Sequence, residues 1–233
     1  MMVLELRQYT LYGGRREELI GLFEREFITP QNAVGAHVVG TFRDLDDPDR
    51  FVWLRSFRDM AARPAALEAF YHGLAWAAHR AAANATMLDS GNVLLLRPYC
   101  EPAPAASVAR PLPRTTGMLR LTLHYLGAVE PLHFAEFFET HWAPRIETRG
   151  VPILGRFVTE SSPNNYAPLP VREGESVFAW LARLDSAAAE RTFSVALAAD
   201  SGWRDGVSEE LLPALMRKPE VLRLAPTASS VLR

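Results

Sequence analysis

The sequence has very little cysteine, no long hydrophobic run and no marked excess of charge. Cys100 is the one cysteine among 233 residues, so no intramolecular disulfide can form and a reducing compartment fits. No stretch approaches the roughly 18 apolar residues that span a bilayer. Glu5 and Arg7 interrupt the N-terminal segment where a signal peptide needs an unbroken apolar core. We therefore expect a cytoplasmic protein that does not enter a membrane.

The motifs of several large enzyme classes are also missing. A net charge of −2 gives no reason to expect nucleic acid as a partner. The chain has no P-loop, no Gly-x-Ser-x-Gly elbow and no Gly-x-Gly-x-x-Gly after a strand, which argues against an NTPase, a serine hydrolase and a Rossmann oxidoreductase. No His-x-x-x-His and no cysteine pair has ligand spacing, so no metal site is predicted.

The N-terminal half shows strand and helix patterns in the order β-α-β-β-α-β, which is typical of a ferredoxin-like unit. The predicted strands are 4–11, 34–43, 51–57 and 93–97, and the predicted helices are 19–27 and 60–86, the latter divided at Gly73. The segment 44–49, rich in Asp and containing Pro48, predicts the turn of a hairpin.

The C-terminal half repeats this order after a proline-rich stretch, 99–114, that reads as a linker. Trp53 precedes Val93 by 40 residues, and Trp180 precedes Val221 by 41, an agreement that favours an internal repeat. The sequence thus predicts an α+β protein of two tandem ferredoxin-like units, 1–98 and 115–233. We expect their open sheet faces to form an intramolecular dimeric α/β-barrel; two separate units that each pair with another chain are the alternative.

The first half resembles the NIPSNAP family. The resemblance rests on LELRQYTL, on FRDLDDPDRFVWLRSF, on AFY at 69–71, on the Trp-x-x-His-Arg of 76–80 and on NVLLL at 92–96. It covers about residues 3–98 and implies the dimeric α/β-barrel superfamily. Residues 115–233 are similar only in pattern, so they read as a diverged NIPSNAP-like domain.

The resemblance implies no single mechanism. Roles in vesicle or mitochondrial biology are suggested for eukaryotic members of the family, and the wider superfamily includes cofactor-independent monooxygenases, haem-binding enzymes and polyketide-tailoring enzymes. A function taken from a shared fold is only an analogy.

Strand alternation predicts one polar and one aliphatic face in each sheet. The aliphatic face, which includes Leu4, Leu6, Val52 and Leu54, is expected under the helices, and the polar face is expected to line a cavity between the sheets. Buried guanidinium groups need anionic or carbonyl partners, so this cavity would take an anionic or carbonyl-rich small molecule. The predicted binding residues are Arg7, Tyr9, Arg43, Trp53, Arg55, Arg120 and Trp180. The alternative is that arginines at strand ends, such as Arg43, simply reach water.

Three histidines are candidate catalytic residues, because an imidazole exchanges protons near neutral pH. His124 falls on the polar face of its strand and is favoured. His79 follows Trp76 on an alanine-rich helix and could equally be a packing residue. His141 resembles the placement of a functional histidine in EthD-like barrel proteins. No cofactor is predicted, although any of these histidines could ligate haem.

Two classes of function therefore remain open. The first is a small-molecule binder or cofactor-free tailoring enzyme of secondary metabolism that uses the cavity. The second is a non-catalytic protein-interaction module, and in either case further homo-oligomerisation is possible. A ligand that accompanies the purified protein would favour the first, and a defined protein partner the second.

Overall fold

The structure is a computed structural model that describes residues 1–99, 117–204, 206–209, 211–215 and 217–233. The chain divides into two compact units. Unit 1 comprises Met1–Arg97, Glu160–Gly174 and Ala225–Leu232, and unit 2 comprises the described parts of 98–159 and 175–224 together with Arg233. All but Tyr99 of the predicted linker 99–114 lies outside the described residues.

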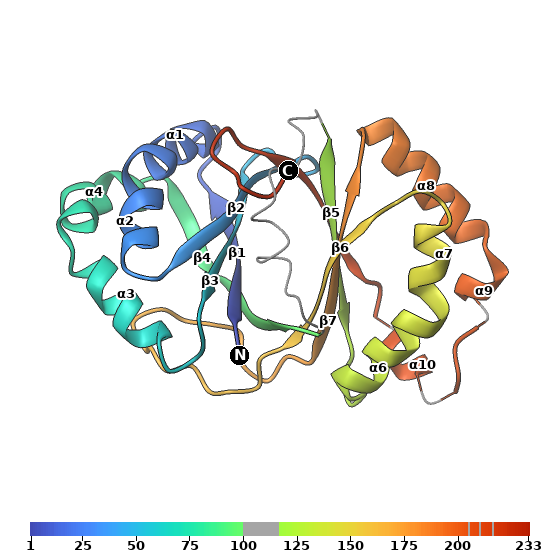
Figure 1. Ribbon diagram of the computed structural model, residues 1–233. Coiled ribbons are helices and arrows are strands. Elements are labelled where there is room, and N and C mark those ends of the chain that lie inside the picture. The colour runs from blue at the N-terminus through green and yellow to red at the C-terminus, as the bar shows by residue number, and fades with distance from the viewer. Residues whose placement is uncertain (100–116, 205, 210, 216) are drawn as a thin grey trace. The chain divides into compact units, whose positions relative to one another are not determined.

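Unit 1 is a four-stranded antiparallel sheet with helices on one face (Figure 1). Its elements are β1 (Val3–Leu11), α1 (Arg16–Leu22), a π-helical turn η1 (Phe23–Phe27), α2 (Ile28–Ala33), β2 (His37–Asp44), β3 (Arg50–Phe57), α3 (Arg63–Tyr71), α4 (Leu74–Asn84) and β4 (Met87–Pro98). Hydrogen bonding orders the strands β4-β1-β3-β2. The predicted α+β ferredoxin-like unit is confirmed.

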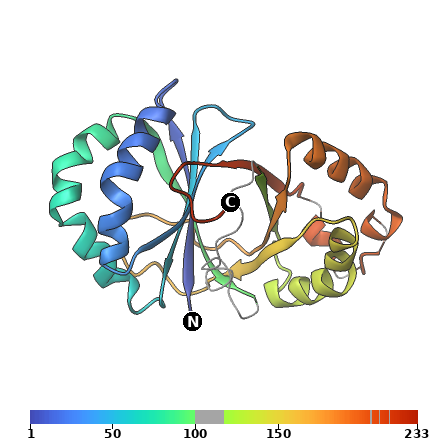
Figure 2. The same ribbon diagram turned by 45° about the horizontal axis from the view of Figure 1, so that its top comes forward.

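Unit 2 has the same plan, again with its helices on one face of the sheet (Figure 2). Its elements are β5 (Met118–Tyr125), α6 (Pro131–Phe137), a π-helical turn η2 (Phe138–Trp142), α7 (Ala143–Glu147), β6 (Ile153–Thr159), β7 (Val177–Leu184), α8 (Ala187–Ala199), α9 (Ser201–Arg204), α10 (Leu212–Leu215) and β8 (Glu220–Pro226). Its strands are ordered β8-β5-β7-β6.

Local signals in the sequence account for several element boundaries. In the β2–β3 turn, the carboxylates of Asp44 and Asp47 accept hydrogen bonds from the backbone N–H groups of Asp46 and Asp49 at 2.8 and 3.0 Å, which is how Asp favours turns. Ser186 caps α8 by accepting a hydrogen bond from the backbone N–H of Ala189. The predicted break of the long helix at Gly73 is present.

Both units interrupt their regular structure at matching places. Each inserts a π-helical turn in its first helical segment, at Phe23–Phe27 and at Phe138–Trp142. Each also shifts strand register next to a glycine, between Val38 and Gly40 in β2 and between Ile153 and Gly155 in β6. These shifts mark β-bulges, which re-aim the side chains that follow them.

In unit 1 the helices cover the face of the sheet that carries Tyr9 and Trp53, which is the opposite face from the one predicted. Tyr9, Phe51 and Trp53 pack against Phe23 and Phe27 of the helical layer of unit 1. The expectation that the aliphatic face lies under the helices is therefore wrong, and so is the expectation that the polar face lines a cavity between sheets. The alternation itself is correct, and the aliphatic residues Leu4, Leu6, Val52 and Leu54 are buried on the other face. Alternation separates two faces but does not say which one the aromatic helices will cover.

Candidate functional site

Unit 1 contains a buried cluster in which three arginines surround one carboxylate, Glu5. Oε2 of Glu5 accepts hydrogen bonds from Nη1 of Arg7 at 2.8 Å and from Nε and Nη2 of Arg55 at 2.9 and 2.6 Å. Oε1 accepts one from Nε of Arg63 at 2.7 Å. All four side chains are at most 1% exposed, so bulk solvent does not reach this cluster.

The electrostatics of this cluster keep Glu5 ionised. Burial by itself would raise the pKa of Glu5, but the charges of Arg55, Arg7 and Arg63 together outweigh burial and hold that pKa well below its ordinary value of 4.5. One carboxylate and three guanidinium groups leave a surplus of positive charge. The adjoining cavity, lined by residues that include Tyr9, Gln31 and Trp53, measures only about 30 Å³. The cavity beside the Glu5 cluster is thus too small for a ring-sized organic substrate.

Unit 2 holds a larger pocket on the corresponding, helix-covered face of its sheet. Its volume is about 230 Å³, and it is lined by Arg120, Thr122, His124, Trp180, Ser194, Leu197, Ala198, Trp203, Lys218, Pro219 and Val221. A dry cavity of about 150 Å³ is enough to hold benzene, whereas drug-sized pockets start at about 300 Å³. The pocket therefore suits a single substituted ring.

Arg120 of β5 supplies the charge of the unit 2 pocket. Its Nη1 donates to Oε1 of Glu190 and, at 2.6 Å, to Oγ of Ser194, and its Nε donates to Oγ1 of Thr122 at 3.2 Å. Oε2 of Glu190 also accepts a hydrogen bond from Nε of Arg223 at 2.9 Å. With Lys218 at the lining, the cations around the pocket outnumber this one carboxylate.

His124 lines the pocket and has one ring nitrogen without a hydrogen-bond partner among the described residues. Nε2 of His124 accepts a hydrogen bond from Nε1 of Trp180 at 3.2 Å, which places the imidazole proton on Nδ1. Nδ1 is buried and has no hydrogen-bond partner within the described part of the chain. Burial, and secondarily the charge of Arg120, lower the pKa of His124 to about 3. At neutral pH His124 is therefore an uncharged hydrogen-bond donor and a very weak base.

The structure divides the predicted site residues between the two units. Arg7, Tyr9, Trp53 and Arg55 share the buried face of unit 1, and Arg120, His124 and Trp180 share the pocket of unit 2. Arg43 belongs to neither group, because it pairs with Glu17 at 2.6 Å on the surface. Arg43 thus follows the alternative expectation, in which an arginine at a strand end reaches water. The predicted binding role of Arg43 has no support.

The other two candidate histidines lie outside both sites. His79 has a 35% exposed side chain, and its Nε2 lies 3.4 Å from Oε2 of Glu26. His141 is exposed and stacks on Phe137, with Nδ1 3.3 Å from the backbone oxygen of that residue. Neither histidine is among the residues that line the cavity of about 30 Å³ or the pocket of about 230 Å³, so a catalytic role for either stays a prediction.

Residues that sequence reasoning missed complete both clusters. Arg63 and Gln31 of unit 1, and Glu190 and Ser194 of unit 2, come from helices rather than from strands. Glu190 did leave a signal: it occupies the same face of α8 as the buried Phe193 and Leu197, three and seven residues away. A lone carboxylate on an apolar helix face predicts a buried cation opposite it.

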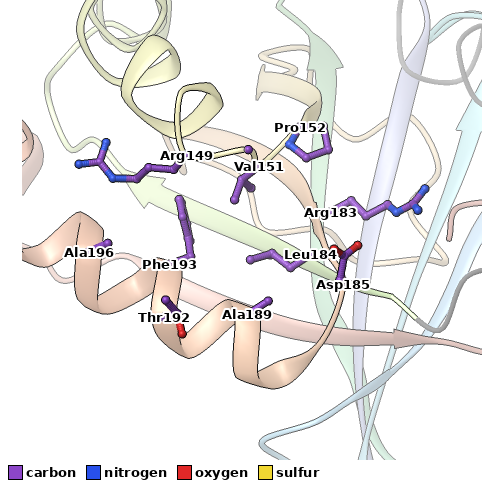
Figure 3. A pocket seen from close by; sticks show the side chains of 11 residues that line it. Arg149, Val151, Pro152, Arg183, Leu184, Asp185, Ala189, Thr192, Phe193 and Ala196 are labelled. Carbon is purple, nitrogen blue, oxygen red and sulfur yellow. The ribbon is translucent and has the colours of Figure 1, made fainter.

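A second pocket of unit 2 is larger than the pocket that contains His124, and its middle is apolar. It measures about 760 Å³ and lies in unit 2 between α8, the end of β7 and the 149–152 segment. Val151, Leu184 and Phe193 form its apolar middle, while Arg149 and Arg183 extend away from it in opposite directions (Figure 3). Arg149 already donates to Oδ2 of Asp200 at 2.5 Å.

The described residues offer no cluster of three or more His, Cys, Asp or Glu side chains that could hold a metal ion. Haem does not fit the unit 2 pocket, because 230 Å³ is less than drug-sized ligands need and Nε2 of His124 is already bound by Trp180. Within the same residues, no helix combines the length and apolar character needed to cross a membrane.

Comparison with known proteins supports the architecture. Residues 4–100 match the model of the NIPSNAP family, which confirms the resemblance of the first half. A search of curated proteins by sequence found no match.

Solved structures share the fold over nearly the whole chain. A candidate monooxygenase from Lactobacillus acidophilus is 11% identical with a TM-score of 0.56, covering 97% of this chain and 93% of its own. One from Fusobacterium nucleatum is 8% identical with a TM-score of 0.58, covering 97% and 92%. An anthrone oxidase-like protein is 10% identical with a TM-score of 0.55, covering 97% and 91%. The chain is thus an α+β protein with the two-unit, ferredoxin-like fold of these monooxygenase-like proteins, and its first unit carries the NIPSNAP match.

Proposed function

We propose that the unit 2 pocket binds a small anionic or carbonyl-rich molecule of about one substituted ring, and that the chain acts on it as a cofactor-free tailoring enzyme. The observation that carries this proposal is that His124, whose buried Nδ1–H has no partner among the described residues, lines a pocket together with Arg120. A buried donor without a partner costs free energy, and a ligand oxygen would remove that cost. The names of the full-length structural neighbours point to the same class of chemistry.

The pocket is suited to stabilise the ionised form of its ligand. Nδ1–H of His124 would donate to a carbonyl, enolate or phenolate oxygen, and Arg120 would offset its negative charge. With a pKa of about 3, His124 is a poor proton acceptor, so its role is donation rather than base catalysis. Trp180 and Trp203 would supply apolar walls for the ring. The expected effect is a lowered pKa of an acidic ligand on binding.

The test uses 4-nitrophenol, a single-ring probe whose ionisation changes its visible absorbance. We expect the purified protein to lower the apparent pKa of the bound probe, and we expect His124→Phe to abolish that shift, since Phe keeps the ring contacts with Phe134 and Trp142. The matched control, His79→Phe, changes a histidine outside the pocket and should behave as the parent protein does. Benzoate should likewise bind more tightly than benzamide.

The opposite results would reject the proposal. If the neutral probe binds as well as the ionised one, the pocket does not select anions. If none of these ligands binds, a non-catalytic interaction module becomes the better explanation of the chain.

A further inference from the structure

The described residues do not balance the buried charge of the Glu5 cluster in unit 1. Among the described residues, Arg7, Arg55 and Arg63 form ion pairs with one carboxylate only, that of Glu5. The remaining polar contacts of the arginines are neutral: Tyr9 for Arg7, Gln31 for Arg55, and Asn164 and Asn165 for Arg63. Burying unpaired charge in a low dielectric costs several kcal/mol for each ion, so a missing negative charge is expected close by.

Tyrosine ionisation does not supply that charge. Tyr9 accepts a hydrogen bond from Nε of Arg7 at 3.0 Å and could in principle become a phenolate. Burial outweighs the nearby arginines, however, and raises the pKa of Tyr9 above its ordinary value of 10.0. Tyr9 therefore stays protonated at neutral pH, and none of the printed ion pairs of the described residues supplies a second negative charge to these arginines.

Two residues that line the cavity beside this cluster carry an N–H donor without a partner among the described residues. Nε2 of Gln31 and Nε1 of Trp53 are buried and have no hydrogen-bond partner within the described residues, and both residues line the cavity of about 30 Å³. The other side of the Gln31 amide accepts from Nη1 of Arg55 at 2.8 Å, and the Arg55 guanidinium lies 5.1 Å from the centre of the Trp53 ring. The lining thus includes two residues with an unused N–H donor, and the Arg55 guanidinium contacts both side chains.

We propose that this cavity is a binding site for one small inorganic anion, with chloride as the best-fitting example. The volume of about 30 Å³ exceeds the roughly 10–15 Å³ that one water needs and is far below the roughly 150 Å³ that holds benzene, so it suits a monatomic anion. Phe23, Phe27 and Phe70 also line the cavity, and the edges of aromatic rings are positive and favour an anion. The anion would offset part of the surplus charge of the Glu5 cluster, and this role is independent of the unit 2 pocket.

The first measurement is the Tm of the full-length protein as sodium chloride replaces sodium gluconate at constant ionic strength. Gluconate is too large for the cavity, so we expect a saturable rise of several degrees with chloride, as mass action requires when a ligand binds only the folded state. Bromide, which is only slightly larger, should act similarly and should appear by anomalous scattering beside Gln31 and Trp53. Equal Tm values throughout the series, with water in the cavity, would overturn the proposal.

Variants at one position separate the anion from a general salt effect. Gln31→Glu places a carboxylate beside Arg55, so it should raise the Tm without chloride and remove the chloride response. Gln31→Met removes the donor and should weaken the apparent chloride affinity at least tenfold. The matched control is Gln8→Met, because the buried side chain of Gln8 also lacks a hydrogen-bond partner among the described residues but alternates to the other face of β1. That variant should keep the full chloride response; a response that persists in Gln31→Glu would also overturn the proposal.

Discussion

At the scale of single residues, burial acts in opposite ways on the two ionisable groups at the centre of the sites. Glu5 stays charged because three guanidinium groups face it, although burial alone would neutralise it. His124 stays neutral because burial and the nearby Arg120 both oppose a second positive charge. Each group therefore links the stability of the fold to pH, and the two act in different pH ranges.

Replacing Glu5 by Gln should destabilise the protein by about 3–5 kcal/mol at neutral pH, because three buried cations lose their one carboxylate. The pKa of Glu5 is lower in the folded state than its ordinary value of 4.5. Its contribution is therefore complete above about pH 4.5 and is lost progressively as the pH falls below it. Urea unfolding at pH 7, 4.5 and 3 measures both effects. The gap between parent and variant should narrow in acid, and a constant gap would contradict the assigned role.

His124 should make the protein less stable as the pH falls from about 6.5 towards 3. The unfolded chain takes up a proton near the ordinary pKa of 6.5, whereas the folded state resists protonation down to about 3. The slope should approach about 1.4 kcal/mol per pH unit, and His124→Gln should lack it. Unfolding free energies between pH 6.5 and 5 avoid the range in which Glu5 titrates. Parallel curves for parent and variant would show that His124 protonates freely in the folded protein.

At the scale of elements, the two sheets have a tryptophan at the same position, but the charged residue near it is acidic on β1 and basic on β5. Arg7 lies opposite Trp53 in unit 1, and Thr122 lies opposite Trp180 in unit 2. Two residues before Arg7, strand β1 carries Glu5, and two residues before Thr122, strand β5 carries Arg120. The strand partner of Glu5 is Arg55, but the strand partner of Arg120 is Ala182. Unit 2 must therefore take its counter-charge, Glu190, from helix α8.

The β2 bulge gives a prediction about one element. A Cβ on Gly40 would lie 2.3 Å from Cζ of the Phe42 ring, a buried side chain with no room to move away freely. We expect Gly40→Ala to destabilise the protein by about 1–3 kcal/mol through overpacking. Gly21 in α1 is the matched control, since a Cβ there meets nothing within 4 Å. Gly21→Ala should stabilise by roughly 0.5–1 kcal/mol through helix propensity. Chemical denaturation of both variants measures the difference, and equal effects would contradict it.

At the scale of the whole molecule, segments from the C-terminal half of the sequence form hydrogen bonds with both outer strands of unit 1, β4 and β2. On β4, the backbone oxygens of Val93 and Leu95 accept hydrogen bonds from the N–H groups of Arg172 and Glu160. On β2, the backbone oxygens of Val39 and Thr41 accept from Leu232 and Thr227, respectively. Exposed strand edges promote aggregation, so these segments complete unit 1.

Removal of residues 227–233 should therefore destabilise unit 1. The truncation deletes the hydrogen bonds to β2, the 2.6 Å contact between the hydroxyls of Thr227 and Thr41, and the buried side chain of Leu232. The expected loss is about 3 kcal/mol or more from hydrogen bonds and apolar burial together. Urea unfolding and light scattering measure stability and association. Val231→Ala, at a side chain that is 53% exposed, is the control. An unchanged unfolding midpoint in the truncated chain would contradict the role of this segment.

The sequence by itself determined the α+β class, the element order of both units and the two-faced character of the strands, because periodicity and turn chemistry are local properties. It also placed Arg120, His124 and Trp180 on one face, since alternation from Arg120 to His124 continues along a single strand.

Only the tertiary structure decided which sheet face the helices cover and which carboxylate meets which arginine. Arg63 lies 58 residues from Glu5, and Glu190 lies 70 residues from Arg120, so no local pattern links them. Helices rich in aromatic residues packed over the face that already carried Trp53 and Trp180. That packing buries the guanidinium groups together with their carboxylates, because a buried charge persists only where its partner is buried with it.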